Sequence, residues 1–126
     1  MKLTKHFTLE ELTYSATMEQ KGLSNRIEPT VFEKVLRNLV YLAQTLEKVR
    51  REAGYKPLRV NSGYRNNTCN ALVGGVKNSL HKSGLACDIP KDYCSRDILA
   101  KYFHYVLDEP NWYHCELHPK SLEIDE

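Results

Sequence analysis

An apolar stripe between residues 30 and 53 constrains the fold more than any other feature of the sequence. Its members recur every three or four positions: Phe32, Val35, Leu36, Leu39, Ala43, Leu46 and Val49. This spacing places them on one face of an α-helix, and most charged side chains of the segment lie off that face. Thr30 and Glu33 match a capping box at the start, and Gly54 is a typical stop signal. The stripe predicts one long amphipathic helix that buries its apolar face in a core.

Shorter elements are predicted on both sides of this helix. Residues 1–29 are expected to form an arm with one short helix, because Thr8 and Glu11 make a second capping box flanked by Phe7 and Leu12. After the long helix we expect, in chain order, a strand at 57–61, a helical turn at 66–73, a strand at 85–89, a helix from Ser95 or Asp97 to Leu107, and a strand hairpin within 111–125. The length suits one core and the sequence shows no repeat, so residues 1–126 are predicted to form a single α+β domain.

Charge and composition argue against several classes of function. The formal net charge is only +2, and acidic and basic residues are mixed along the 126-residue chain, so no nucleic-acid partner is expected. No apolar run reaches the length of a membrane span, and residues 1–6 lack the apolar core of a signal peptide. We therefore expect a protein that is cytoplasmic at synthesis and is released, if at all, by lysis or a dedicated machinery. The four cysteines contain no C-x-x-C pair and are expected to be reduced thiols.

A carboxylate inside an apolar run marks the stretch of the chain that carries most of the chemistry. Asp88 stands in the run L-A-C-D-I at 85–89, which predicts a buried strand. A buried carboxylate needs a positive partner, because an unpaired charge in an apolar site is very costly. A metal ion shared with His81, seven positions earlier, would supply that charge, and zinc accepts both imidazole and carboxylate ligands. Spacing alone leaves a second interpretation open, in which His81 is a loop residue and Asp88 is structural.

Two further polar residues precede this pair. Arg65 follows the S-G-Y turn at 62–64, where a guanidinium can hold a carboxylate through two hydrogen bonds. Ser79 lies two positions before His81 and can hydrogen-bond a ligand or a substrate carboxylate. On local evidence alone, both also fit ordinary solvent-facing loop residues.

Together these motifs resemble the D-alanyl-D-alanine carboxypeptidase family of zinc peptidases, in particular its small branch with phage-associated murein peptidases. The S-G-Y-R turn at 62–65 is followed by an intact S-x-H-x-x-G-x-A-x-D run from Ser79 to Asp88. The resemblance implies an α+β fold of the Hedgehog/D-Ala-D-Ala-peptidase type, with helices packed on a small antiparallel sheet. It also implies one Zn²⁺ ion bound by His81 and Asp88, and substrate contacts from Arg65, Ser79 and Tyr64.

The family's third ligand is a histidine on a late strand, and two alignments of the tail compete for it. In the first, W-Y-H-C-E at 112–116 is that strand, which makes His114 the ligand and Glu116 a nearby carboxylate that can act as general base. In the second, L-E-I-D at 122–125 is that strand, which places Glu123 at the ligand position and His118 across the turn. The roles of His118 and Glu123 as ligand and base can then be exchanged. Both alignments stay open.

The function implied by the resemblance is hydrolysis of an amide bond in a peptidoglycan stem peptide or cross-bridge, as a carboxypeptidase or an endopeptidase. Zinc would activate water and polarise the carbonyl, an acidic residue would carry the proton, and Arg65 would stabilise charge or anchor a carboxylate. The expected partner is a peptidoglycan peptide, and the protein is expected to be a monomer. The alternative is a catalytically degenerate module of the same family that binds peptidoglycan or a protein without cleaving it.

Overall fold

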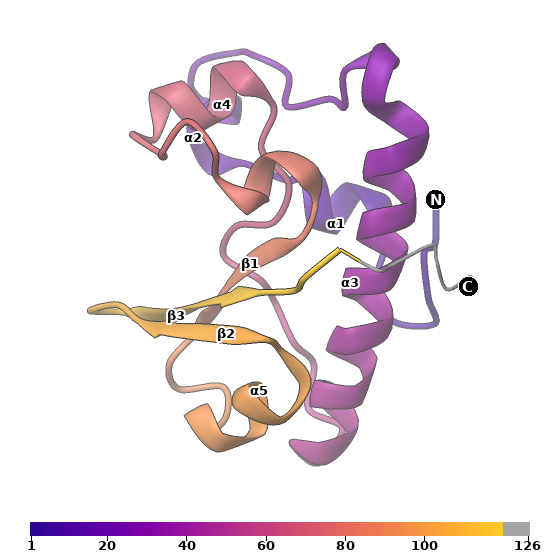
Figure 1. Ribbon diagram of the computed structural model, residues 1–126, viewed down its shortest axis with the longest axis vertical. Coiled ribbons are helices and arrows are strands. Elements are labelled where there is room, and N and C mark those ends of the chain that lie inside the picture. Colours follow the sequence, from indigo (N-terminus) through magenta and orange to yellow (C-terminus); the bar gives the residue numbers. More distant parts are fainter. Residues whose placement is uncertain (120–126) are drawn as a thin grey trace.

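The structure, a computed structural model, describes residues 1–119. One long helix runs along one side of the molecule, and most of the other helices and a small sheet lie to one side of it (Figure 1). The helices are α1 (Leu9–Thr13), α2 (Ala16–Gln20), α3 (Phe32–Glu52), α4 (Asn67–Leu72) and α5 (Arg96–Tyr102), with 3-10 turns η1 (Pro29–Val31) and η2 (Leu80–Ser83). The strands are β1 (Ala86–Pro90), β2 (Tyr105–Asp108) and β3 (Trp112–Glu116). The predicted α+β class and the antiparallel sheet are confirmed.

Helix α3 confirms the long amphipathic helix, with a different start. Its buried residues are Val35, Leu39, Leu42, Ala43, Thr45, Leu46 and Val49. Thr30 lies in the preceding turn η1, and the cap residue Val31 offers no side-chain hydrogen bond, so the predicted capping box of Thr30 and Glu33 is wrong. Phe32, at the first position of the helix, is 38% exposed rather than part of the core. Within the described residues, no helix is both long and apolar enough to cross a bilayer.

The sheet has the strand order β1-β3-β2, and both strand pairs are antiparallel. Its two faces differ in character, because side chains alternate between the faces along each strand. Cys87, Ile89, Val106 and Cys115 are buried in the same core as the apolar stripe of α3. Asp88 and His114 lie on the opposite face, and this second face carries the site described below.

Two predicted elements differ in the structure. The helix expected to reach Leu107 begins at the Ser95 cap but ends at Tyr102, and residues 105–108 form strand β2 instead. Pairing with β3 stabilises that strand. The prediction used the helical spacing of Val106, which carries no information about a partner strand that is distant in the sequence. The predicted strand at 57–61 is wrong: the structure assigns no strand there, and an isolated bridge joins the next residue, Ser62, to Asp88. The predicted return strand at 122–125 lies outside the described residues.

The N-terminal arm packs on the turn that precedes the site. The capping box of Thr8 and Glu11 is confirmed, and Leu12 of α1 is fully buried. The Tyr64 backbone N–H donates to the Leu12 carbonyl over 2.8 Å. This contact is so close that a Cβ atom on Gly63 would lie 2.5 Å from the Leu12 oxygen. A glycine is therefore required at 63 by the close approach of two backbone segments.

We predict that Gly63→Ala destabilises the protein by ~2–3 kcal/mol, because rigid backbone atoms must move to admit the methyl group. Gly22→Ala is the matched control: its φ is +68, but an added Cβ would meet nothing within 4 Å. That variant should lose only about 1 kcal/mol, the usual cost of a left-handed conformation. The measurement is the free energy of unfolding in urea. An equal loss in both variants would contradict the proposed role of the Leu12 contact.

Candidate metal centre

Strand register places Asp88 beside His114. The two residues are direct partners in the antiparallel pair β1–β3. The Asp88 N–H donates to the Ser62 carbonyl and the Asp88 carbonyl accepts from Asn61, so both backbone groups point away from β3. Asp88 and His114 therefore form a non-hydrogen-bonded pair, the arrangement in which cross-strand side chains approach most closely. Nδ1 of His114 lies 3.1 Å from Oδ1 of Asp88.

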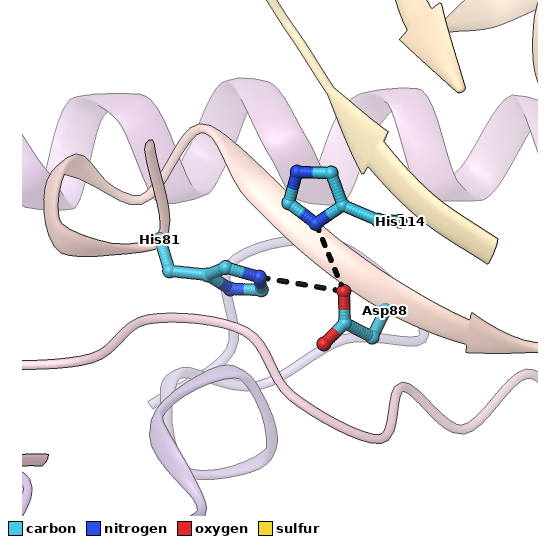
Figure 2. Close-up of side chains that lie close together, drawn as sticks. All are labelled: His81, Asp88 and His114. Atoms are coloured by element: carbon cyan, nitrogen blue, oxygen red, sulfur yellow. Dashed lines mark hydrogen bonds and ion pairs between the residues drawn. The ribbon is translucent and has the colours of Figure 1, made fainter. Parts of the chain in front are cut away.

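His81 reaches the same carboxylate from the turn η2. The Ser79 hydroxyl accepts from the His81 N–H at the start of this turn, and Gly84, at φ +81, ends it. The His81 ring donates Nδ1–H to the Gly63 carbonyl over 2.7 Å, which leaves a lone pair on Nε2. That Nε2 lies 3.3 Å from Asp88 Oδ1 (Figure 2), yet it is buried and makes no hydrogen bond.

This arrangement fits a bound cation. The nearest atoms of His81 and Asp88 are both acceptors, so their lone pairs oppose each other unless a positive charge lies between them. One ligand atom from each of His81, Asp88 and His114 lies within 4.8 Å of the other two. Among residues 1–119, no other three His, Cys, Asp or Glu side chains are grouped this closely. Two imidazoles and one carboxylate, with a fourth position open, are a typical ligand set for catalytic zinc.

The electrostatics of the cluster also favour a cation. Burial raises the pKa of Asp88, but the hydrogen bond with His114 and the nearby histidine rings outweigh it and bring the pKa down to about 2. The hydrogen bond with Asp88 raises the pKa of His114 to about 9, against the opposing effect of burial and with a further contribution from Glu116. The carboxylate is therefore ionised at neutral pH and stabilises positive charge beside it.

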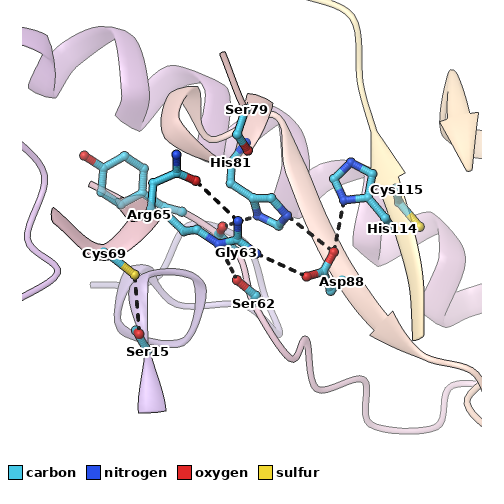
Figure 3. Close-up of polar contacts among 12 residues, drawn as sticks. Ser15, Ser62, Gly63, Arg65, Cys69, Ser79, His81, Asp88, His114 and Cys115 are labelled. Atoms are coloured by element: carbon cyan, nitrogen blue, oxygen red, sulfur yellow. Dashed lines mark hydrogen bonds and ion pairs between the residues drawn. The ribbon is translucent and has the colours of Figure 1, made fainter. Parts of the chain in front are cut away.

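Arg65 lies at the edge of this cluster. Its guanidinium is 3.5 Å from Asp88 Oδ2, and it donates to the Ser62 hydroxyl over 3.3 Å and to the Asn70 side-chain oxygen over 3.4 Å (Figure 3). These distances are at the long end for hydrogen bonds. A guanidinium has five N–H donors, so donors remain for an oxygen atom of a substrate.

The other residues proposed from the sequence lie in different surroundings. Tyr64 is 2% exposed and belongs to the hydrophobic core, and its predicted substrate contact stays a prediction. Glu116 accepts from Nε2 of His114 over 2.7 Å. His118 is outside the cluster, with its ring stacked on that of His104 at 4.4 Å. Glu123 lies outside the described residues, so its predicted role stays a prediction.

Three contributors to the site were not anticipated from the sequence. Gly63 acts through its backbone carbonyl, which leaves no side-chain pattern to detect. Ser62 and Asn70 hold the Arg65 guanidinium. A sequence signal existed for Asn70, because an asparagine among the residues of a predicted helical turn is a candidate for a buried hydrogen bond.

Comparison with known proteins agrees with this geometry. Residues 5–109, which include His81 and Asp88, match the family described as Peptidase M15. A zinc D-Ala-D-Ala carboxypeptidase from Streptomyces albus G is 48% identical over 44 residues, which are 35% of this chain and 17% of that protein. The chain thus matches less than a fifth of the length of this relative. The family resemblance predicted from the sequence is confirmed, and the chain belongs to the Peptidase M15 family.

Proposed function

We propose that the protein is a zinc metallopeptidase that hydrolyses an amide bond in the stem peptides or cross-bridges of peptidoglycan. The observation that carries this proposal is the convergence of His81, Asp88 and His114 around one position, with Arg65 beside it. The Peptidase M15 match and the similarity to a protein named as a zinc D-Ala-D-Ala carboxypeptidase support both the metal and the substrate class. One zinc ion is expected in this site.

In the proposed reaction, the role of each residue follows from its position in the site. Bound zinc supplies a Lewis acid that polarises a carbonyl and lowers the pKa of water. His81 and Asp88 are held by the η2 turn and by strand β1, and His114 by strand β3, so three separate elements fix the ligand geometry. Such a site is preorganised before substrate arrives, which avoids the cost of ordering it during the reaction.

Arg65 is suited to hold the oxygen atoms of the substrate. Its side chain is 15% exposed and lies on the Asp88 side of the cluster, next to the proposed metal position. Its unused N–H groups can donate to a carbonyl oxygen as negative charge develops there, or bind a terminal carboxylate through two hydrogen bonds. The first use suits an endopeptidase and the second a carboxypeptidase.

The alternative of a degenerate binding module rested on doubt about the third ligand. Strand β3 brings His114 within 3.1 Å of Asp88, and this proximity supports His114 as the third ligand beside His81 and Asp88. No observation on these residues favours the alternative over hydrolysis. Release by lysis or by phage machinery stays a prediction from the sequence.

Incubation of the full chain, loaded with zinc, with purified peptidoglycan tests the proposed function. Chromatography and mass spectrometry of the products should show either free D-alanine, for a carboxypeptidase, or loss of cross-linked dimers, for an endopeptidase. The D-Ala-D-Ala dipeptide serves as a second substrate to separate cleavage of the free dipeptide from cleavage of the wall. Intact peptidoglycan and dipeptide after exposure to the zinc-loaded protein would overturn the proposal.

We predict that His81→Ala and His114→Ala each reduce bound zinc from about one ion per chain to a small fraction, since each removes one of three ligands. His118→Ala is the matched control and should retain zinc, because its ring stacks on His104 outside the cluster. Inductively coupled plasma mass spectrometry of the purified proteins measures the metal. Zinc retained in His114→Ala and lost in His118→Ala would reverse the assignment of the third ligand.

We predict that Arg65→Ala keeps its zinc but loses ~10²–10³-fold in kcat/KM, a typical effect of removing one donor to a developing oxyanion. Arg65→Lys should recover only part of this loss, because a lysine cannot form the two-pronged contact. Steady-state kinetics and metal content are measured on the same preparations. Unchanged kcat/KM in the alanine variant would remove Arg65 from the site.

We predict that the stability of the metal-free protein falls between pH 6.5 and 9. The folded-state pKa of His114 is raised to about 9 from 6.5, so its stabilising contribution is complete below 6.5 and disappears as the pH rises through 9. The loss should be on the order of 2 kcal/mol in chelator-containing buffer. Urea unfolding at several pH values measures it, and His114→Ala should lack this component. Parallel pH profiles for the two proteins would contradict the prediction.

A further inference from the structure

We propose that Glu116 is a positioning residue for the metal centre: it orients the His114 ring and keeps the Nδ1 lone pair directed at the ion. This inference rests on the proposed zinc site. In this role Glu116 is not the general base expected from the sequence. The effect of replacing Glu116 is a change in zinc affinity, which is measured without the reaction.

The strand places the two side chains for this contact. His114 and Glu116 are two positions apart on β3, so they project from the same face of the sheet. Nε2 of His114 donates to Oε2 of Glu116 over 2.7 Å, a shorter contact than the 3.1 Å between Nδ1 and Asp88. The Glu116 side chain is 27% exposed, so this bond is partly shielded from water.

This bond decides which ring nitrogen is available to the metal. With a metal ion bound, the His114 imidazole would be neutral and carry one proton, and an acceptor at Nε2 would hold that proton there. Nδ1, which faces Asp88, is then the nitrogen with the free lone pair. A carboxylate at this position also makes the imidazole a stronger electron donor toward a metal ion.

The other histidine of the cluster is held by an equivalent contact. His81 donates its outer nitrogen, Nδ1, to the Gly63 carbonyl and turns Nε2 toward Asp88. Both histidines therefore direct one nitrogen to Asp88 and give the N–H of the other to a protein oxygen. The acceptor is a neutral carbonyl for His81 and a carboxylate for His114.

The same geometry argues against Glu116 as the general base. Its carboxylate contacts the ring nitrogen that is remote from Asp88, so the imidazole lies between Glu116 and the proposed metal position. A base must come within hydrogen-bond reach of the proton that it removes. Among residues 1–119, the ion-pair partner recorded for Glu116 is His114.

Zinc affinity, measured by chelator competition on the full chain, tests this role. Glu116→Ala should bind zinc ~10–100-fold more weakly, the usual effect of losing such an outer partner. Glu116→Gln retains an oxygen that accepts the N–H and should recover part of the affinity. Asp108→Ala is the matched control, because Asp108 is a carboxylate on the neighbouring strand that pairs with Lys91 instead, and it should bind zinc as the unmodified protein does.

Proton NMR of the zinc-loaded proteins gives a second readout that a purely structural role would not change. A downfield, exchange-protected imidazole N–H resonance of His114 should be present in the unmodified protein, retained in Glu116→Gln and lost in Glu116→Ala. Glu116→Gln is nearly isosteric, so its weaker affinity carries the test if the alanine variant does not fold. Affinity within twofold of the unmodified protein in both variants, or an unchanged resonance in Glu116→Ala, would overturn the proposal. Both measurements are made without substrate, so a protein that binds zinc but cleaves no peptidoglycan would overturn the proposed function alone.

Discussion

The carboxylate of Asp88 is the constraint on which the rest of the site depends. It is 6% exposed, and a charge buried to that degree is tolerated only when other groups compensate it. His114 and Arg65 supply part of that compensation, at 3.1 Å and 3.5 Å from the carboxylate oxygens, and Nε2 of His81 lies 3.3 Å from the same carboxylate. Because two imidazoles are aimed at one carboxylate oxygen, a metal ion between them would complete the compensation of the buried charge, and the three side chains could hold such an ion.

The core supports this arrangement from the other face of the sheet. Cys87 and Cys115 are buried neighbours of Asp88 and His114, and they anchor β1 and β3 in the core formed with α3. The turn at Gly63 links the site to the N-terminal arm. The Gly63 carbonyl accepts from Nδ1–H of His81, and the adjacent Tyr64 N–H donates to the Leu12 carbonyl of α1. The N-terminal arm is therefore part of the scaffold of the candidate metal centre, since it helps to fix the carbonyl that orients His81.

Local patterns predicted the local elements well. The apolar spacing of α3 and the capping box of α1 depend on contacts within one or two turns, and both elements are present. The failures came where distant pairing decided the outcome. Residues 105–108 have helix-compatible spacing but form β2, because β3 offers them a complete antiparallel partner. Tyr64, next to Arg65 in the sequence, is buried in the hydrophobic core.

The sequence by itself determined the long helix, the α+β class and the pair of His81 and Asp88, because helical periodicity and the S-x-H-x-x-G-x-A-x-D run are properties of neighbouring residues. It left His114, His118 and Glu123 as candidates for the third ligand. The register of β3 on β1 sets His114 opposite Asp88, 26 positions away in the chain, whereas His118 stacks on His104 and Glu123 lies outside the described residues. The same register places Glu116 next to Nε2 of His114, the ring nitrogen that is remote from Asp88. A register of this kind is fixed by the packing of both sheet faces and by the hydrogen bonds of the whole ladder. A shift of β3 by one residue would turn His114 and Glu116 toward the core.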